Sequence, residues 1–136
     1  MKHLITCSAA ALLAAPVCIV AQARTIEENM EETLALINEL SDILENVTPQ
    51  SADACLAELE QLESRILALK NEADTYTDEE KKAILQNPEI VSKLQAPTER
   101  LMKAIIMLHI AAGQNPEPQQ QAELKKIIDK LESFKL

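Results

Sequence analysis

The sequence is poor in glycine and in aromatic residues, and both shortages argue against a strand-rich fold. Gly113 is the only glycine, and Tyr76 and Phe134 are the only aromatic residues among 136. Sheet domains usually draw on aromatic side chains for packing and on glycine for tight turns. A core that must be built from Leu, Ile, Val, Ala and Met instead favours an all-helical protein.

Histidine and cysteine are also scarce, which argues against most catalytic and metal centres. The chain contains two His and three Cys. It has no Cys-x-x-Cys pair, no glycine-rich phosphate loop and no Glu-x-x-His pair of the di-iron bundle type. We therefore predict a non-enzymatic protein, and we assign it no catalytic, cofactor-binding or metal-ligating residue and no cofactor.

Residues 1–23 have the composition of a secretory signal peptide. Lys2 precedes an apolar run from Leu4 to Val20, and Ala21-Gln22-Ala23 matches the small-x-small cleavage pattern. A lipid-modified Cys18 and a retained membrane anchor are the alternatives, although Pro16 interrupts a run already short for a membrane span. We predict cleavage after Ala23, a periplasmic or secreted location, and no membrane association thereafter.

The predicted mature chain, residues 24–136, has the length of a single domain. Its first part, residues 24–63, contains eleven acids and one cation, whereas residues 64–136 contain eleven of each. Such an acidic region disfavours nucleic acid and anionic lipid as partners. Three interpretations of the acidic region stay open: it binds a basic protein partner, it holds divalent cations weakly, or it is only a solvated surface. The sequence does not indicate the oligomeric state.

Capping signals and prolines divide residues 24–136 into helices. Thr25 with Glu28 and Thr77 with Glu80 match capping boxes. The expected helices run from Ile26 to about Asn46, from Pro49 to about Ala73, over a short stretch near 78–86, from about 89 to 112 with a bend at Pro97, and from about Glu117 to Phe134. We predict an all-α, up-down-up-down four-helix bundle whose third helix is interrupted or kinked by prolines, with a short fifth helix before Pro88 as a variant. Gly113 suits the left-handed position that ends a helix.

Two apolar patterns define the expected core. The first helix has an apolar stripe at helical spacing, comprising Met30, Leu34, Ile37, Leu40 and Leu44, with Leu36, Ile43 and Val47 beside it. The second has a continuous 4-3 seam, comprising Cys55, Leu59, Leu62, Ile66, Leu69, Ala73 and Tyr76. Both patterns predict faces that pack against other helices.

Three features leave alternatives open. His109 could bind a metal or haem, or it could be a helix-end histidine that complements the helix dipole. Cys55 could be a redox or dimerising thiol, or a small buried apolar residue, which its seam position favours. Asn46-Val47-Thr48 matches the N-glycosylation pattern, but Pro49 and the bacterial look of the signal argue against its use.

The segment Ile26-Glu-Glu-Asn-Met30-Glu-Glu-Thr-Leu34 resembles the opening helix of the periplasmic b-type cytochromes, which are four-helix haem bundles. The resemblance implies that Met30 is an axial haem ligand. The family's second ligand is a His near the end of the last helix, where this chain has none. We expect Met30 and His109 near opposite ends of the bundle, and therefore no haem bound between them.

Our leading hypothesis is an exported, non-enzymatic helical bundle that acts as a binding or interaction module. A haem-binding electron carrier of the cytochrome kind is the first alternative. A chaperone-like or inhibitory protein with an exposed apolar groove is the second.

Overall fold

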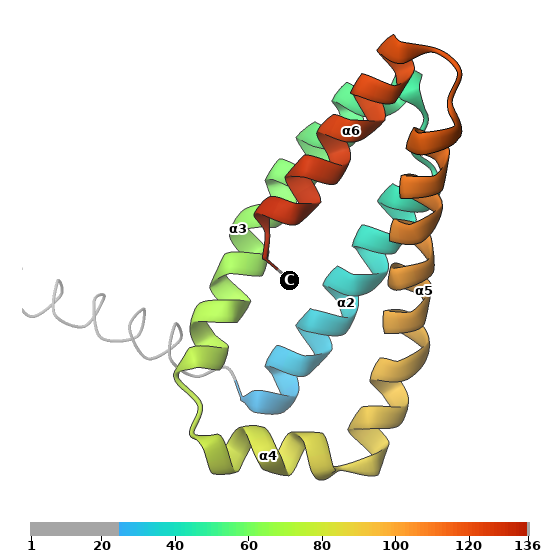
Figure 1. The fold of residues 1–136 in the computed structure, drawn as a ribbon. Helices are drawn as coiled ribbons and strands as arrows, with labels where there is room; N and C mark the ends of the chain where they lie inside the picture. The colour runs from blue at the N-terminus through green and yellow to red at the C-terminus, as the bar shows by residue number, and fades with distance from the viewer. Residues whose placement is uncertain (1–24, 136) are drawn as a thin grey trace, which may run out of the picture.

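The computed structural model describes residues 25–135 and confirms the prediction of an all-helical protein. The elements are α2 (Ile26–Glu45), the 3-10 turn η1 (Pro49–Ser51), α3 (Ala52–Asp74), α4 (Asp78–Gln86), α5 (Pro88–Gln114) and α6 (Pro118–Ser133), as Figure 1 shows. The predicted signal peptide and its cleavage site lie outside the described residues and stay predictions.

The four longer helices alternate in direction along the chain (Figure 1). In that view α2 and α5 run upward and α3 and α6 run downward, while α4 crosses the lower end. Helix α2 packs against α3 and α5, and α6 packs against the same two helices. The described chain thus has five α-helices where four were expected, because the short helix before Pro88 is a separate element.

Side-chain caps explain where α2 and α4 begin. The Thr25 hydroxyl accepts a hydrogen bond from the Glu28 backbone nitrogen at 3.1 Å, and the Glu28 carboxylate accepts one from the Thr25 backbone nitrogen at 3.2 Å. Thr77 and Glu80 form the same reciprocal pair at the start of α4. Both predicted capping boxes are present, so each satisfies backbone donors that the first helical turn leaves unpaired.

The expectation for Gly113 was wrong. Helix α5 continues through Pro97 and Gly113 to Gln114, and Gly113 does not adopt a positive φ angle. The helix ends at Asn115, whose backbone is extended. A residue that precedes proline disfavours the helical conformation, so Pro116 rather than Gly113 accounts for this end.

The core is concentrated where all four longer helices meet. Its buried apolar residues are Leu36, Leu40, Leu44, Ala52, Cys55, Leu59, Leu62, Leu69, Ala104, Leu108, Leu124, Ile127, Ile128, Leu131 and Phe134. The lower parts of both predicted apolar faces are only partly buried: Met30, Leu34, Ile37, Ile66 and Ala73. Helix α4 buries no residue, and α5 buries only Ala104 and Leu108.

Candidate functional site

The lower half of the molecule has three long helices around it instead of four. Helix α6 has 16 residues, against 23 in α3 and 27 in α5, the two helices on which it packs. At 1.5 Å per residue, roughly 10 to 16 Å of those neighbours extends beyond its length. Figure 1 shows α6 stopping well above α4, so among residues 25–135 no fourth helix lies over the lower parts of α2, α3 and α5.

An apolar groove of about 420 Å³ lies in this region. Its lining comes from α2, α3 and α5 and comprises Asn29, Met30, Thr33, Leu36, Ile37, Leu40, Ile66, Leu69, Lys70, Ala73 and Leu101. The partly buried side chains of the two predicted apolar faces therefore converge on one surface. Because they lie at helical spacing on α2 and α3, they form the kind of surface on which a further helix packs.

Polar contacts hold one end of the groove in place. Asn29 is 5% exposed, and its side-chain amide donates a hydrogen bond of 2.9 Å to the carboxylate of Glu72, which ties α2 to α3. The Thr33 hydroxyl donates one of 2.8 Å to the Asn29 carbonyl. A buried amide with a partner does not carry the free-energy cost of an unpaired polar group. The groove is therefore anchored across two helices while its walls stay apolar.

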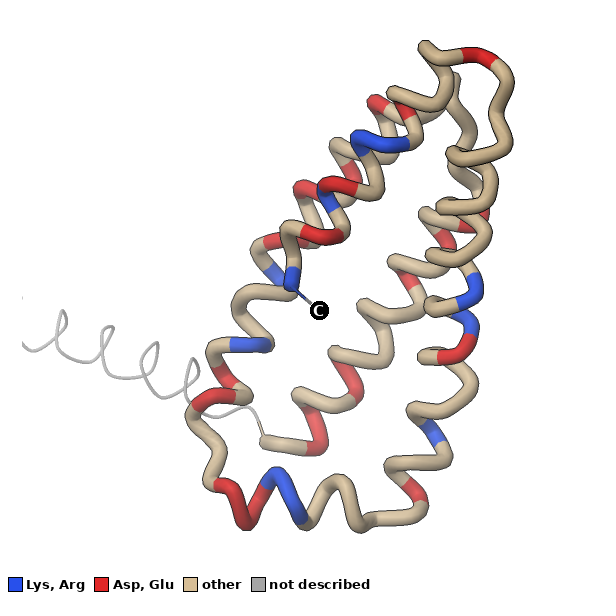
Figure 2. Tube along the Cα trace, viewed as in Figure 1, with Lys and Arg blue, Asp and Glu red and all other residues tan. Residues whose placement is uncertain are grey.

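Acidic residues predominate around the lower end of the groove, although the one charged residue in its lining is Lys70. Segments 26–37 and 66–82 together contain nine acids and three cations. Figure 2 shows these acids at the start of α2 and along the turn into α4, near the lower end. An apolar surface beside a negative field favours a ligand that is both apolar and cationic.

Interhelical ion pairs join α2 to α3 and to α5. Arg65 of α3 lies 2.6 Å from Glu32 and 2.8 Å from Glu39, both on α2. Arg100 of α5 contacts Glu45 at 2.7 Å and Asp42 at 2.5 Å. The hydrogen bonds that each guanidinium donates to these carboxylates raise the pKa of that guanidinium. The pairs are exposed to solvent, so they fix the register of the helices more than they add stability.

A second, larger hollow of about 790 Å³ lies along the junction of α2 and α5 near the upper end. Arg100, Glu45, Glu99 and Lys103 are among its lining residues, and Arg100 and Glu45 already pair with each other. Two of its four charged residues are committed to this interhelical ion pair, whereas the groove below α6 is apolar and no fourth helix of the described chain lies over it. The smaller groove is therefore the better candidate for a binding site.

The structure does not bring Met30 and His109 together. Met30 lines the groove together with Leu101, whereas His109 lies eight residues beyond Leu101 on α5, about 12 Å further along the helix. Among the groove's lining residues only Met30 has a side chain of the haem-ligating kind. The residues present therefore do not fit a six-coordinate haem held by this pair.

The other two candidates have structural roles. Cys55 is 5% exposed within the core, and burial, with a smaller contribution from Glu58, raises the pKa of its thiol to about 11. Its predicted inward position is confirmed. The Asn46 side chain donates a hydrogen bond of 2.8 Å to the Asp42 carbonyl at the end of α2, and Thr48 caps η1. Both polar residues of the Asn46–Thr48 motif therefore take part in local capping.

The groove itself was not predicted as a site. The available signal was a difference in length: the last helix of the sequence is clearly shorter than the helices expected over 49–73 and 89–112. Periodicity identified Met30, Ile37, Ile66 and Ala73 as inward-facing, but it could not show that the fourth helix stops before reaching them.

Comparisons with protein-family models, with curated proteins and with solved structures found no match. Within residues 25–135, no group of three or more His, Cys, Asp or Glu is placed to hold a metal ion. Over the same described residues, no helix has the length and apolar character needed to cross a membrane. The geometry and charge of the groove therefore carry the functional interpretation.

Proposed function

We propose that this protein is an exported, non-enzymatic binding module of the four-helix-bundle kind, and that it holds a cationic amphipathic helix of another protein in the groove below α6. The observation that carries the proposal is the apolar groove where the fourth helix position is unoccupied. Binding of an amphipathic helix in an apolar groove is a common mode of recognition, with anchors at every third or fourth residue.

Helix α6 supports the choice of occupant, because it fills the same position higher in the molecule. It packs on α3 and α5 through Leu124, Ile127, Ile128, Leu131 and Phe134, all buried. Its Lys130 lies 2.7 Å from Glu63 of α3. Helices α3 and α5 thus already pack against an amphipathic helix that carries a cationic side chain at its edge.

The size of the site follows from the helix lengths. Helices α3 and α5 are longer than α6 by 7 and 11 residues, respectively. A bound helix would therefore contact the groove over about two to three turns. Methionine at the groove, in Met30, adapts its shape easily, which suits recognition of more than one apolar sequence.

The test is a binding titration with a synthetic Leu/Lys amphipathic peptide of about 14 residues, four helical turns. Ala73→Lys fills the groove and adds a positive charge, so it should weaken binding by at least about tenfold, equivalent to about 1.4 kcal/mol. Ala68→Lys adds the same charge to an exposed position of the same helix and should leave the affinity nearly unchanged.

Two results would count against the groove as the site. One is equal binding by the Ala73→Lys and Ala68→Lys variants. The other is tighter binding of a Leu/Glu peptide than of the Leu/Lys peptide, which would contradict the electrostatic part of the proposal. Export is tested separately by N-terminal sequencing of the purified protein, which should begin at Arg24.

A further inference from the structure

The outward face of α5 carries large apolar side chains that are exposed to solvent. Met102 is 58% exposed, Ile106 54% and Ile110 43%. His109 and Gly113 are exposed on the same helix. Helices that are apolar on every side normally occur where both faces are covered. The inward face of α5, including Ala104 and Leu108, is already buried in the core.

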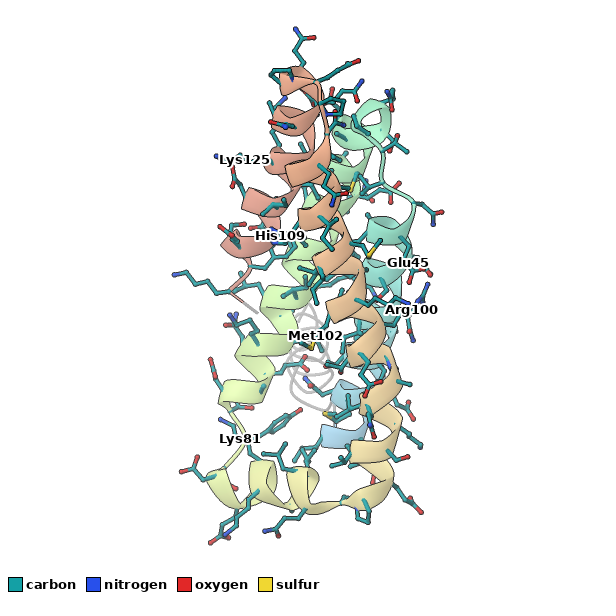
Figure 3. The ribbon with its side chains drawn as sticks, turned by 45° about the vertical axis from the view of Figure 1, so that its right-hand side comes forward. Glu45, Lys81, Arg100, Met102, His109 and Lys125 are labelled. Atoms are coloured by element: carbon teal, nitrogen blue, oxygen red, sulfur yellow. The ribbon has the colours of Figure 1, made fainter. Side chains whose placement is uncertain are left out.

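These outward residues form a continuous seam. Met102, Ile106, His109 and Gly113 follow a 4-3-4 spacing, which keeps them on one side of the helix; we call them the α5 seam. Figure 3 shows Met102 and His109 on the same side of α5, away from Arg100 and its partner Glu45. The α5 seam is thus a separate surface from the ion-paired junction with α2.

Three of the four residues of the α5 seam also lie in the least charged stretch of the described chain, and Met102 lies just before it. Residues 104–116 contain no Asp, Glu, Lys or Arg, although the protein carries a net charge of −9. Two copies of so acidic a protein repel each other over most of their surfaces. A face without charge is where a second copy can approach at the lowest electrostatic cost.

Gly113 provides a second, independent observation. It lies inside α5 without a positive φ angle, and a Cβ built on it meets no atom within 4 Å. Glycine inside a helix is less favourable than alanine. Neither the backbone conformation nor packing within this chain therefore requires glycine here. The open space beside it is available to a side chain from another molecule.

We infer that the α5 seam is a homodimer interface in which two copies of α5 pack antiparallel about a two-fold axis between Ile106 and His109. In this register Met102 of each copy lies opposite Gly113 of the other, so the long side chain fills the space that glycine leaves. Ile106 lies opposite His109. An isologous interface requires such self-complementarity, because the same patch must serve both copies.

Disulfide trapping in the full chain tests both the dimer and its register. The double variant Met102→Cys/Gly113→Cys should form covalent dimers under mild oxidation. Its two new thiols lie about 16 Å apart along one helix, too far to bridge within a copy. Met102→Cys alone should not form covalent dimers, because the antiparallel register separates position 102 of one copy from position 102 of the other. The wild-type chain, with Cys55 buried and with Cys7 and Cys18 present wherever the predicted signal peptide is retained, gives the background.

Two further variants show whether the trapping reflects a true interface. Adding Ile106→Asp to the double variant should abolish covalent dimers, and sedimentation equilibrium of Ile106→Asp alone should show a monomer. Gly113→Leu should raise the Tm of the monomer, since leucine favours helix, yet weaken the dimer at least about tenfold. Covalent dimers from Met102→Cys alone would overturn the antiparallel register. A wild-type protein that stays monomeric at about 100 μM, well above the Kd of a stable homodimer, would overturn the interface.

Discussion

The side-chain nitrogen of Lys70 on α3 lies 3.4 Å from the main-chain oxygen of Lys135, to which it donates a hydrogen bond. This contact places the residues that follow α6 level with Lys70 of α3. Beyond it, Ala73 of α3 faces the groove without a helix over it. The groove is thus a consequence of where the last helix stops, because the apolar faces of α2 and α3 continue past that point.

Truncation of Leu62 and Ile66, which are neighbours in the 4-3 pattern of α3, should distinguish a core position from a groove position. Leu62 is 6% exposed in the core, so Leu62→Ala should lower the free energy of unfolding by about 2–5 kcal/mol. Ile66 is only partly buried and lines the groove, so Ile66→Ala should cost less than about 2 kcal/mol. Urea unfolding of both variants measures the difference. Equal losses would show that Ile66 belongs to the closed core.

The Cys55 thiol should react slowly in the native protein. It is 5% exposed and burial raises its pKa to about 11, so both access and thiolate population are low at neutral pH. A chromogenic disulfide reagent should label it much faster in denaturant than in buffer. Similar rates in the two conditions would indicate an exposed thiol and reopen its role in dimer formation.

The Arg100–Glu45 pair should make stability depend on pH in the acidic range. Hydrogen bonding to Arg100 lowers the pKa of the Glu45 carboxyl below its ordinary value of 4.5. A carboxylate with a lowered folded-state pKa stabilises the protein above its ordinary pKa, and this contribution is lost as the pH falls through the folded-state value. Glu45→Gln should therefore destabilise the protein at about pH 6, and this deficit should shrink as the pH falls through the folded-state pKa of Glu45. A deficit unchanged by acidification would contradict this origin.

Haem titration should give no sharp six-coordinate spectrum. Met30 lines a hollow with Leu94, and His109 lies 15 residues beyond Leu94 on α5, about 22 Å further along the helix. One iron cannot bind two ligands so far apart. Visible absorption of the purified protein with added haem is the measurement. A six-coordinate spectrum lost in both Met30→Ala and His109→Ala would contradict the placement of these residues and support the cytochrome alternative.

The sequence was sufficient for the parts of the fold that depend on local interactions. The capping boxes at Thr25 and Thr77 are short-range hydrogen-bond patterns, and Asn87-Pro88 marks the break between α4 and α5 for a local steric reason. Gly113 was misinterpreted because a helix-ending glycine and a helical glycine beside open space look the same in one sequence. Its φ angle and its surroundings, which separate the two, are tertiary information.

The candidate site could be predicted only in part, for a related reason. Helical spacing correctly placed Met30, Ile37 and Ile66 on faces directed toward other helices. Whether such a face is covered depends on how far a partner distant in sequence extends alongside it. Here the extent of cover is set by the end of α6, near Lys135. Lys135 is about 70 residues from Ile66 in the sequence, so the local pattern around Ile66 carries no information about it.

The three methionines outside the predicted signal peptide allow one measurement to test the proposed groove directly. Met30 lines the groove, Met102 lies on the α5 seam, and Met107 lines the larger hollow between α2 and α5. In a spectrum of protein labelled with carbon-13 at the methionine methyl groups, titration with the Leu/Lys peptide should shift the Met30 signal and leave those of Met102 and Met107 in place. A shift of Met102 or Met107 with Met30 unchanged would place binding elsewhere and contradict the proposed function.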